Sequence, residues 1–123
     1  MTARVLVVDD ILSNVKLLEA KLTAEYFEVV TAFNGLECLT KVAETAPDIV
    51  LLDVMMPGMD GPSTVRELRK NPATAGIPVL LLTAKVQSSD QRRFADLGVQ
   101  AVLFKPFDPM TLSAQIAGVL GWS

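Results

Sequence analysis

Short apolar segments alternate with longer segments of helical pattern along the chain, and this alternation limits the possible folds more than any other feature. Two of the apolar segments, 49–52 and 78–82, are almost continuously apolar, which is typical of parallel strands covered on both faces. The repeated β-α order predicts an α/β fold with one parallel sheet and helices on both faces. The expected strands are Ala3–Val8, Phe27–Ala32, Ile49–Leu52, Pro78–Leu82 and Ala101–Phe104.

Local signals predict a helix after each strand. Ile11, Val15, Leu18 and Leu22 have the spacing of one apolar helical stripe. Proline at the first turn and Asn or Ser followed three residues later by Glu or Gln are both typical of helix starts. The remaining helices are expected to start at the Asn34–Glu37 capping box, at Pro62, at the Ser88–Gln91 capping box and at Asp108–Pro109.

Length and composition bound the class of protein. The 123 residues suit a single domain spanning 1–123, and half of them are hydrophobic. The net charge of −3 argues against nucleic-acid binding, and neither a signal peptide nor a membrane span is expected. The single cysteine, Cys38, indicates a reducing compartment, so we expect a cytoplasmic location. The chain contains no histidine, which excludes a self-contained His-based catalytic pair.

Reactive side chains follow four of the five expected strands. Asp9 and Asp10 follow the first strand, Asp53 the third, Thr83 the fourth and Lys105 the fifth. In a sheet of strand order 2-1-3-4-5, ligands bind beyond the carboxyl ends of the strands, where the order reverses. We therefore expect these five side chains to meet in one crevice.

The charges of these residues suggest the chemistry. Three neighbouring carboxylates repel one another, and Lys105 supplies only one positive charge. Oxygen ligands without histidine or cysteine favour a hard cation such as Mg²⁺, so Asp9 and Asp10 are interpreted as metal ligands. A carboxylate beside Mg²⁺ and an ammonium can attack phosphorus, which makes Asp53 the candidate nucleophile. The Thr83 hydroxyl is then placed to donate a hydrogen bond to a phosphoryl oxygen.

These motifs resemble those of a known family. VVDD at 7–10, LLDVMMPGMDG at 51–61, LLTA at 81–84 and FKPF at 104–107 occur in the order and spacing of receiver domains of two-component response regulators. The chain resembles this family over essentially its whole length. Its first forty residues are also similar to receivers fused to diguanylate cyclases. The resemblance implies the flavodoxin-like, CheY-like fold.

The resemblance also implies a metal site. Asp53 would be the phosphoacceptor and would bind Mg²⁺ directly together with Asp10. Asp9 would act mainly through water. The backbone carbonyl of Met55 would complete the protein ligands.

The phosphorylated state is implied to involve two further residues. Thr83 would be the switch hydroxyl, and Lys105 would pair with the phosphoryl oxygens, with a cis peptide bond to Pro106. The phosphoryl group would come from a histidine on a partner kinase or phosphotransfer protein. A conformational change would then signal to an effector protein or a fused output domain, while the domain itself would not be a turnover enzyme.

One position departs from the family pattern. Receivers usually carry an aromatic residue three positions before the lysine, where this chain has Val102. By strand alternation Phe104 points to the same face as Val102, so Phe104 is a candidate substitute. Thr83 is alternatively expected to signal through loop movement.

Two other functions remain open from the sequence. A pseudo-receiver would bind proteins without being phosphorylated, although the acidic cluster, Thr83 and Lys105 argue against it. A Mg²⁺-dependent phosphatase commonly has an acid two residues beyond its aspartyl nucleophile, whereas this chain has Met55. Outside the site, Cys38 is expected to be a buried apolar residue. The expected solvated helix face consists of Arg66, Arg69 and Lys70.

Overall fold

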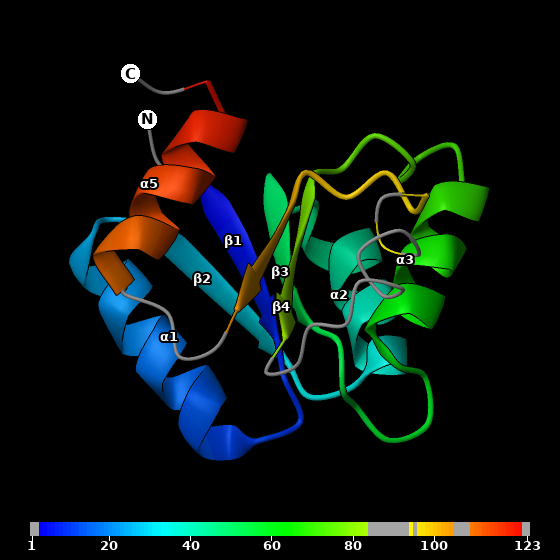
Figure 1. Ribbon diagram of the computed structural model, residues 1–123, viewed down its shortest axis with the longest axis horizontal. Coiled ribbons are helices and arrows are strands. Elements are labelled where there is room, and N and C mark those ends of the chain that lie inside the picture. The colour runs from blue at the N-terminus through cyan, green and yellow to red at the C-terminus, as the bar shows by residue number, and fades with distance from the viewer. Residues whose placement is uncertain (1–2, 84–93, 95, 105–108, 122–123) are drawn as a thin grey trace.

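The fold is a single parallel sheet between two layers of helices (Figure 1). The computed structural model describes residues 3–83, 94, 96–104 and 109–121. The strand order is β2-β1-β3-β4-β5, with every neighbouring pair parallel, as the sequence predicted. The strands are β1 Arg4–Val8, β2 Glu28–Ala32, β3 Ile49–Asp53, β4 Val79–Thr83 and β5 Ala101–Phe104.

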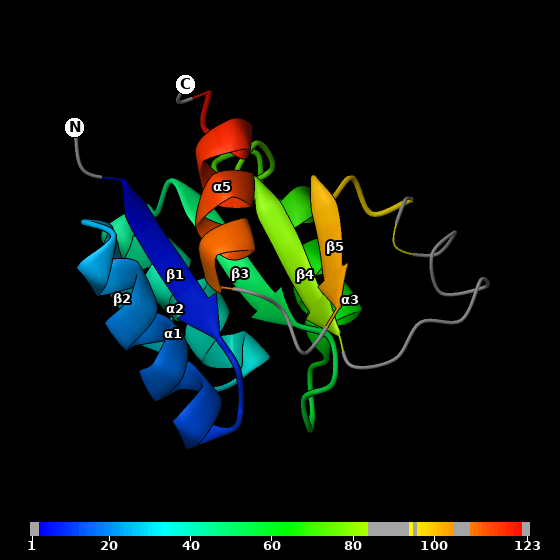
Figure 2. The same cartoon turned by 60° about the vertical axis from the view of Figure 1, so that its left-hand side comes forward.

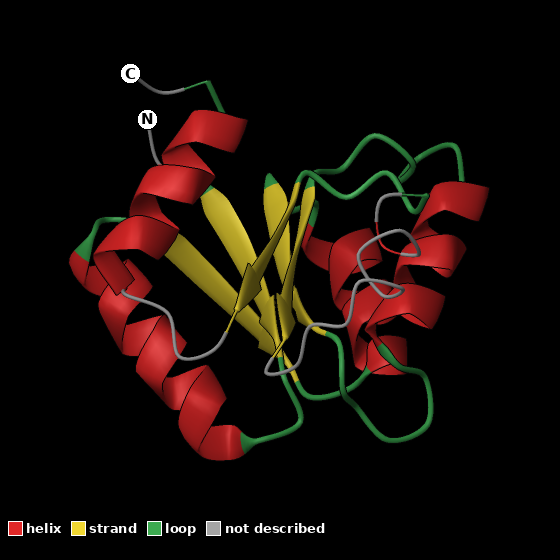
Figure 3. Ribbon diagram, in the orientation of Figure 1, coloured by secondary structure: helices red, strands yellow, loops and turns green. Residues whose placement is uncertain are grey.

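In the described part of the chain, helices pack on both faces of the sheet, two on each face (Figure 3). Helices α1 (Leu12–Ala24) and α5 (Pro109–Val119) lie on one face, and α2 (Gly35–Thr45) and α3 (Gly61–Lys70) lie on the other. Figure 2 shows α5 lying across the sheet on the α1 side. The expected helix start at Ser88–Gln91 lies outside the described residues. Within the described part of the chain, no helix combines the length and apolar character needed to span a membrane.

Alternate residues of each strand feed two separate hydrophobic clusters. The first cluster lies under α2 and α3 and contains Leu6, Val50 and Leu81; the second lies under α1 and α5 and contains Val7, Leu51 and Leu80. Both faces of the central strands are thus buried, which explains why β3 and β4 read as continuous apolar runs. This packing holds the strand ends rigidly in register.

The local start signals of two helices are confirmed. The Asn34 side chain accepts a hydrogen bond from the Glu37 backbone N–H at 2.8 Å and donates to the Glu37 carboxylate at 2.9 Å. Helix α3 begins after Asp60, whose carboxylate accepts from the Ser63 backbone N–H at 2.9 Å, with Pro62 in the first turn. Both caps satisfy backbone donors that a helix leaves unpaired at its start.

The expected apolar stripe of α1 is wrong at its first position. Val15, Leu18 and Leu22 are buried as expected, but Ile11 precedes the helix and is 51% exposed. Ile11 has an extended backbone (φ −98°, ψ 112°), and its N–H is bound to the Asp9 side chain. The β1–α1 loop therefore fixes Ile11 outside the helical register.

The expected solvated face of α3 is wrong at Arg69. Its guanidinium is partly buried and donates to the backbone carbonyls of Ala75 and Ile77, each at 2.9 Å, and of Gly98 at 3.2 Å. Arg69 therefore links the end of α3 to the chain before β4 and to the turn before β5. By contrast, Cys38 is fully buried, as expected.

Candidate functional site

Three aspartates meet at the carboxyl edge of the sheet, where β1 and β3 end side by side. Asp9 and Asp10 directly follow β1, and Asp53 is the last residue of β3. Val8 pairs with Leu52, so the acidic residues follow at adjacent points of the two strands. One carboxylate oxygen from each of Asp9, Asp10 and Asp53 lies within 4.8 Å of the others. The structure thus brings together three of the five side chains that the sequence assigned to one crevice.

Asp9 is the most enclosed of the three. Its exposure is 0%, and each of its oxygens accepts a hydrogen bond. Oδ1 accepts from the Ile11 backbone N–H at 2.9 Å, and Oδ2 accepts from the Asn14 side-chain amide at 3.1 Å. Asp10, the next residue, is exposed. The β1–α1 loop therefore buries one carboxylate and presents its neighbour outward.

Asn14 is a site residue that the sequence reasoning missed. It lies in the first turn of α1, five residues after Asp9, and reads on its own as an ordinary polar helix residue. Its side-chain type could have identified it, because an amide in the first turn of a helix can donate a hydrogen bond to a carboxylate at the end of the preceding strand.

Asp53 lies on β3, with β1 and β4 on either side. Its exposed fraction is 4%, so its carboxylate is largely screened from bulk water. The next residue, Val54, donates its backbone N–H to the Leu82 carbonyl at 2.9 Å and accepts from the Gly61 N–H at 3.0 Å. The loop that follows Asp53 is therefore tied to both β4 and the start of α3.

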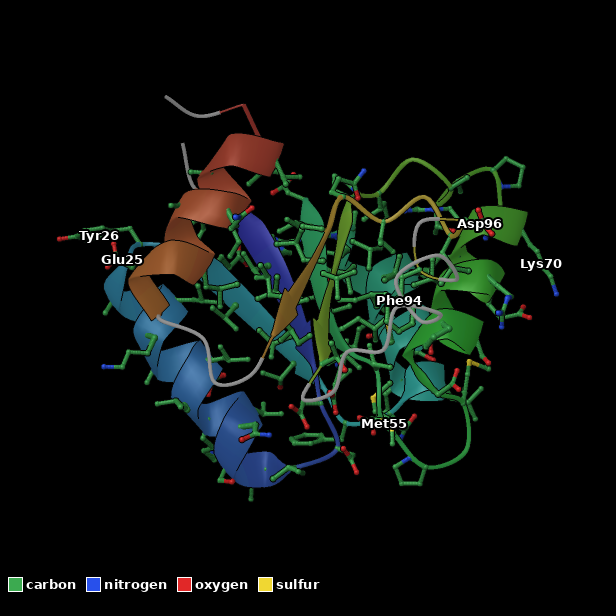
Figure 4. The ribbon with its side chains drawn as sticks, viewed as in Figure 1. Glu25, Tyr26, Met55, Lys70, Phe94 and Asp96 are labelled. Carbon is green, nitrogen blue, oxygen red and sulfur yellow. The ribbon has the colours of Figure 1, made fainter. Side chains whose placement is uncertain are left out.

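Met55 lies in the loop after β3, at the carboxyl edge of the sheet (Figure 4). Its side chain is 67% exposed, whereas Met56 is buried in the cluster under α2 and α3. The backbone of Met55, which the sequence named as a metal ligand, is two residues from Asp53 along this loop.

Thr83 is the last residue of β4 and is buried. Asp53 pairs with Leu82, so Thr83 lies one step further along the neighbouring strand. On its other side β4 pairs with β5, where Thr83 lies opposite Phe104. Lys105 and Pro106 lie outside the described residues.

Val102 occupies the position where receivers usually have an aromatic residue. Its side chain is partly buried and packs against the cluster under α2 and α3. The side chain of Phe104, the candidate substitute, is outside the part of the structure that is described. That Phe104 takes over the role of the aromatic residue missing at position 102 therefore stays a prediction.

The donor set fits a hard divalent cation. All three clustered side chains offer carboxylate oxygens, the ligand type that Mg²⁺ prefers. Two of them, Asp9 and Asp53, are buried, and buried negative charge needs a compensating positive charge. Because both Asp9 oxygens already accept hydrogen bonds, Asp9 suits contact with such a cation through water.

Comparisons with known proteins agree with this geometry. The family profile described as "Response regulator receiver domain" matches residues 5–117. The response regulator PleD of Caulobacter vibrioides is 52% identical over 116 residues, which are 94% of this chain and 26% of PleD. The DNA-binding response regulator MtrA of Mycobacterium leprae is 40% identical, over 94% of this chain and 50% of MtrA. The chain thus spans about a quarter to a half of these relatives.

Solved structures of the same size share the fold. The Vibrio cholerae chemotaxis protein CheY4 superposes with a TM-score of 0.91 at 32% identity, covering 97% of this chain and 99% of CheY4. The receiver domain of the Francisella response regulator 1452 gives a TM-score of 0.90 at 27% identity, covering 98% of each chain. The matches in sequence and fold, over nearly the whole chain, show that it belongs to the response regulator receiver domain family, a family of signalling modules.

Proposed function

We propose that this receiver accepts a phosphoryl group on Asp53 in a Mg²⁺-dependent reaction. The donor is a phosphohistidine on a histidine kinase or a histidine phosphotransfer protein. The whole chain, 1–123, acts as one receiver domain. The observation that carries the proposal is the cluster of Asp9, Asp10 and Asp53, whose carboxylate oxygens lie within 4.8 Å of one another.

The three carboxylates divide into separate roles because their surroundings differ. Asp53 is the last residue of a strand that is buried on both faces. The backbone that carries its carboxylate is therefore held in place, which suits nucleophilic attack. Asp10 is exposed and adjacent, which suits a direct metal ligand. Asp9 is held by Ile11 and Asn14, which suits a ligand that acts through water.

The proposed step is a phosphoryl transfer. An oxygen of Asp53 forms a bond to phosphorus while the bond between phosphorus and the donor imidazole nitrogen breaks, and the imidazole leaves with the bonding electron pair. Asp10, Asp53 and the Met55 carbonyl would hold Mg²⁺, which would supply positive charge near the phosphoryl oxygens. Lys105 supplies a second positive charge, and Thr83 donates a hydrogen bond to the product. The chain needs an external donor because it contains no histidine.

The product is proposed to act as a conformational signal. Phosphorylation adds negative charge and acceptor oxygens at the end of β3, next to Thr83 on β4. Movement of the Thr83 hydroxyl toward these oxygens would carry the change into the chain that follows β4. An effector protein or a fused output domain would read the new surface. The proposed compartment is the cytoplasm, where the free thiol of Cys38 would persist.

The domain is not expected to hydrolyse phosphate esters in steady turnover. The residue two positions beyond Asp53 is Met55, which carries neither an acid nor a base to activate water. The aspartyl-phosphate should therefore be hydrolysed slowly, and the domain should act as a switch instead of a turnover enzyme.

The deciding experiment uses acetyl phosphate as the donor. Intact-mass spectrometry should show one added phosphoryl group in the presence of Mg²⁺, and none with a metal chelator or in Asp53→Asn. An unmodified wild-type chain would instead support a protein-binding module that is not phosphorylated. Repeated turnover of a small phosphate ester would support a phosphatase.

A further inference from the structure

We propose that Asn14 is a positioning residue for the metal centre, acting through Asp9. This inference rests on the proposed Mg²⁺ site and adds a residue to its support. The starting observation is the hydrogen bond of 3.1 Å that the Asn14 side-chain amide donates to Asp9 Oδ2. A carboxylate can accept this bond only from the NH₂ end of the amide, which fixes the orientation of Asn14.

Asn14 is itself held by a rigid element. It is the third residue of α1, and its backbone N–H donates to the Ile11 carbonyl at 3.0 Å. The helix is anchored on the sheet by buried Leu18 and Leu22. The backbone of Asn14 is therefore held in place, and its side-chain hydrogen bond ties the end of β1 to the first turn of α1.

The Asn14 bond completes a closed arrangement around Asp10. One oxygen of Asp9 is bound by the Ile11 backbone N–H and the other by the Asn14 amide, so two residues that follow Asp10 are both tied back to Asp9. Asp10 lies between Asp9 and these two donors in the chain. The direction of the Asp10 side chain toward Asp53 therefore depends on the orientation of Asp9, which Asn14 holds together with the Ile11 N–H.

A neutral hydrogen-bond donor such as the Asn14 amide is suited to a position beside the acidic cluster. A lysine at position 14 would also bind Asp9, but its charge would compensate the acidic cluster and compete with a cation. The amide orients the carboxylate and leaves its negative charge available. Residues that orient metal-binding side chains in this way typically change metal affinity by about 10- to 100-fold when they are replaced.

The test compares Mg²⁺ affinity in wild type, Asn14→Leu and Asn14→Ser, measured by NMR titration of backbone amides. Leucine keeps about the size of the side chain without a donor and is compatible with the helix, and serine is too short to replace the amide. We expect both variants to bind Mg²⁺ about 10-fold more weakly. Ser13→Ala is the matched control, because Ser13 is an exposed neighbour in the same turn, and its affinity should equal that of wild type.

A second readout reports the contact directly. The side-chain NH₂ signals of Asn14 should shift when Mg²⁺ binds to the wild-type protein, because their acceptor is Asp9. Wild-type affinity in both Asn14 variants would overturn the proposed role of Asn14 while leaving the metal site intact. If wild type itself binds no Mg²⁺, the proposed metal site fails instead. If Asn14→Leu does not fold, the result for Asn14→Ser decides.

Discussion

Gly61 lies directly against the backbone that carries Asp53. A Cβ atom at position 61 would stand 2.6 Å from the Asp53 carbonyl oxygen and 2.8 Å from the Val54 Cα. The Gly61 backbone N–H also donates to the Val54 carbonyl at 3.0 Å. The first residue of α3 therefore touches the end of β3 closely enough to exclude any side chain, and its small size allows the close approach of α3 to the proposed phosphoacceptor.

Gly61→Ala should destabilise the protein, although alanine is the better helix former. The added methyl group meets backbone atoms, which cannot move aside as a flexible side chain can. Overpacking of this kind costs about 1–3 kcal/mol. Urea denaturation should show this loss, and phosphorylation by acetyl phosphate should slow. Gly76→Ala is the control, because a Cβ there has open space and should leave stability unchanged or slightly raised. Equal stability of both variants would contradict the close approach.

Asp10→Asn should raise the melting temperature in the absence of divalent cations. Removing one of three clustered negative charges relieves repulsion across less than 5 Å, so a rise of several degrees is expected. Mg²⁺ is expected to stabilise the wild type by about 1.4 kcal/mol at ten times the dissociation constant, and Asp10→Asn should lose this stabilisation. Calorimetry with and without Mg²⁺ measures both the expected rise in melting temperature and the expected loss of the Mg²⁺ response. An equal Mg²⁺ response in both proteins would remove Asp10 from the metal site.

Much of the fold was readable from the sequence because its signals are local. Continuous apolar runs predicted β3 and β4, and the Asn34–Glu37 pair predicted the start of α2. Ile11 was misassigned because its spacing fits the helical stripe, whereas its conformation is set by a bond from its backbone to Asp9. Spacing alone cannot report such a bond.

The sequence predicted those site residues whose position follows from the ends of the strands. Asp9, Asp10 and Asp53 meet because parallel strands end at one edge. Asn14 and Gly61 were not identified, because what distinguishes them is contact with residues of another element. A polar helix residue and a glycine after a turn are common in any sequence, and their partners become visible only in three dimensions.

Arg69→Lys should destabilise the protein even though the charge is kept. The Arg69 guanidinium donates to three carbonyls from two separate turns, and a lysine ammonium cannot reproduce this planar arrangement. Partial burial lowers the pKa of Arg69, in keeping with its position between these turns. A loss of about 1–2 kcal/mol is expected from urea denaturation. Arg66→Lys, at an exposed position of the same helix, should be neutral; a similar loss there would show that α3 responds to any change of arginine.

Cys38 should make the protein less stable as the pH rises above about 9. Burial raises the pKa of the Cys38 thiol from an ordinary 9.0 to about 12. Between these values the unfolded chain loses the thiol proton while the folded chain keeps it, so the unfolded state is favoured. The free energy of unfolding should fall by about 1.4 kcal/mol per pH unit from this group alone.

Denaturation of wild type and Cys38→Ala across this pH range isolates the effect of the thiol. Alanine creates a small cavity, so Cys38→Ala should be less stable at neutral pH. The difference between the two proteins should shrink, and can reverse, as the pH rises from 9 toward 12, because only wild type carries the thiol. Below pH 9 the folded protein should also resist alkylation at Cys38, which is fully buried. A constant difference across the range would show that the thiol ionises as readily in the folded chain as in the unfolded one.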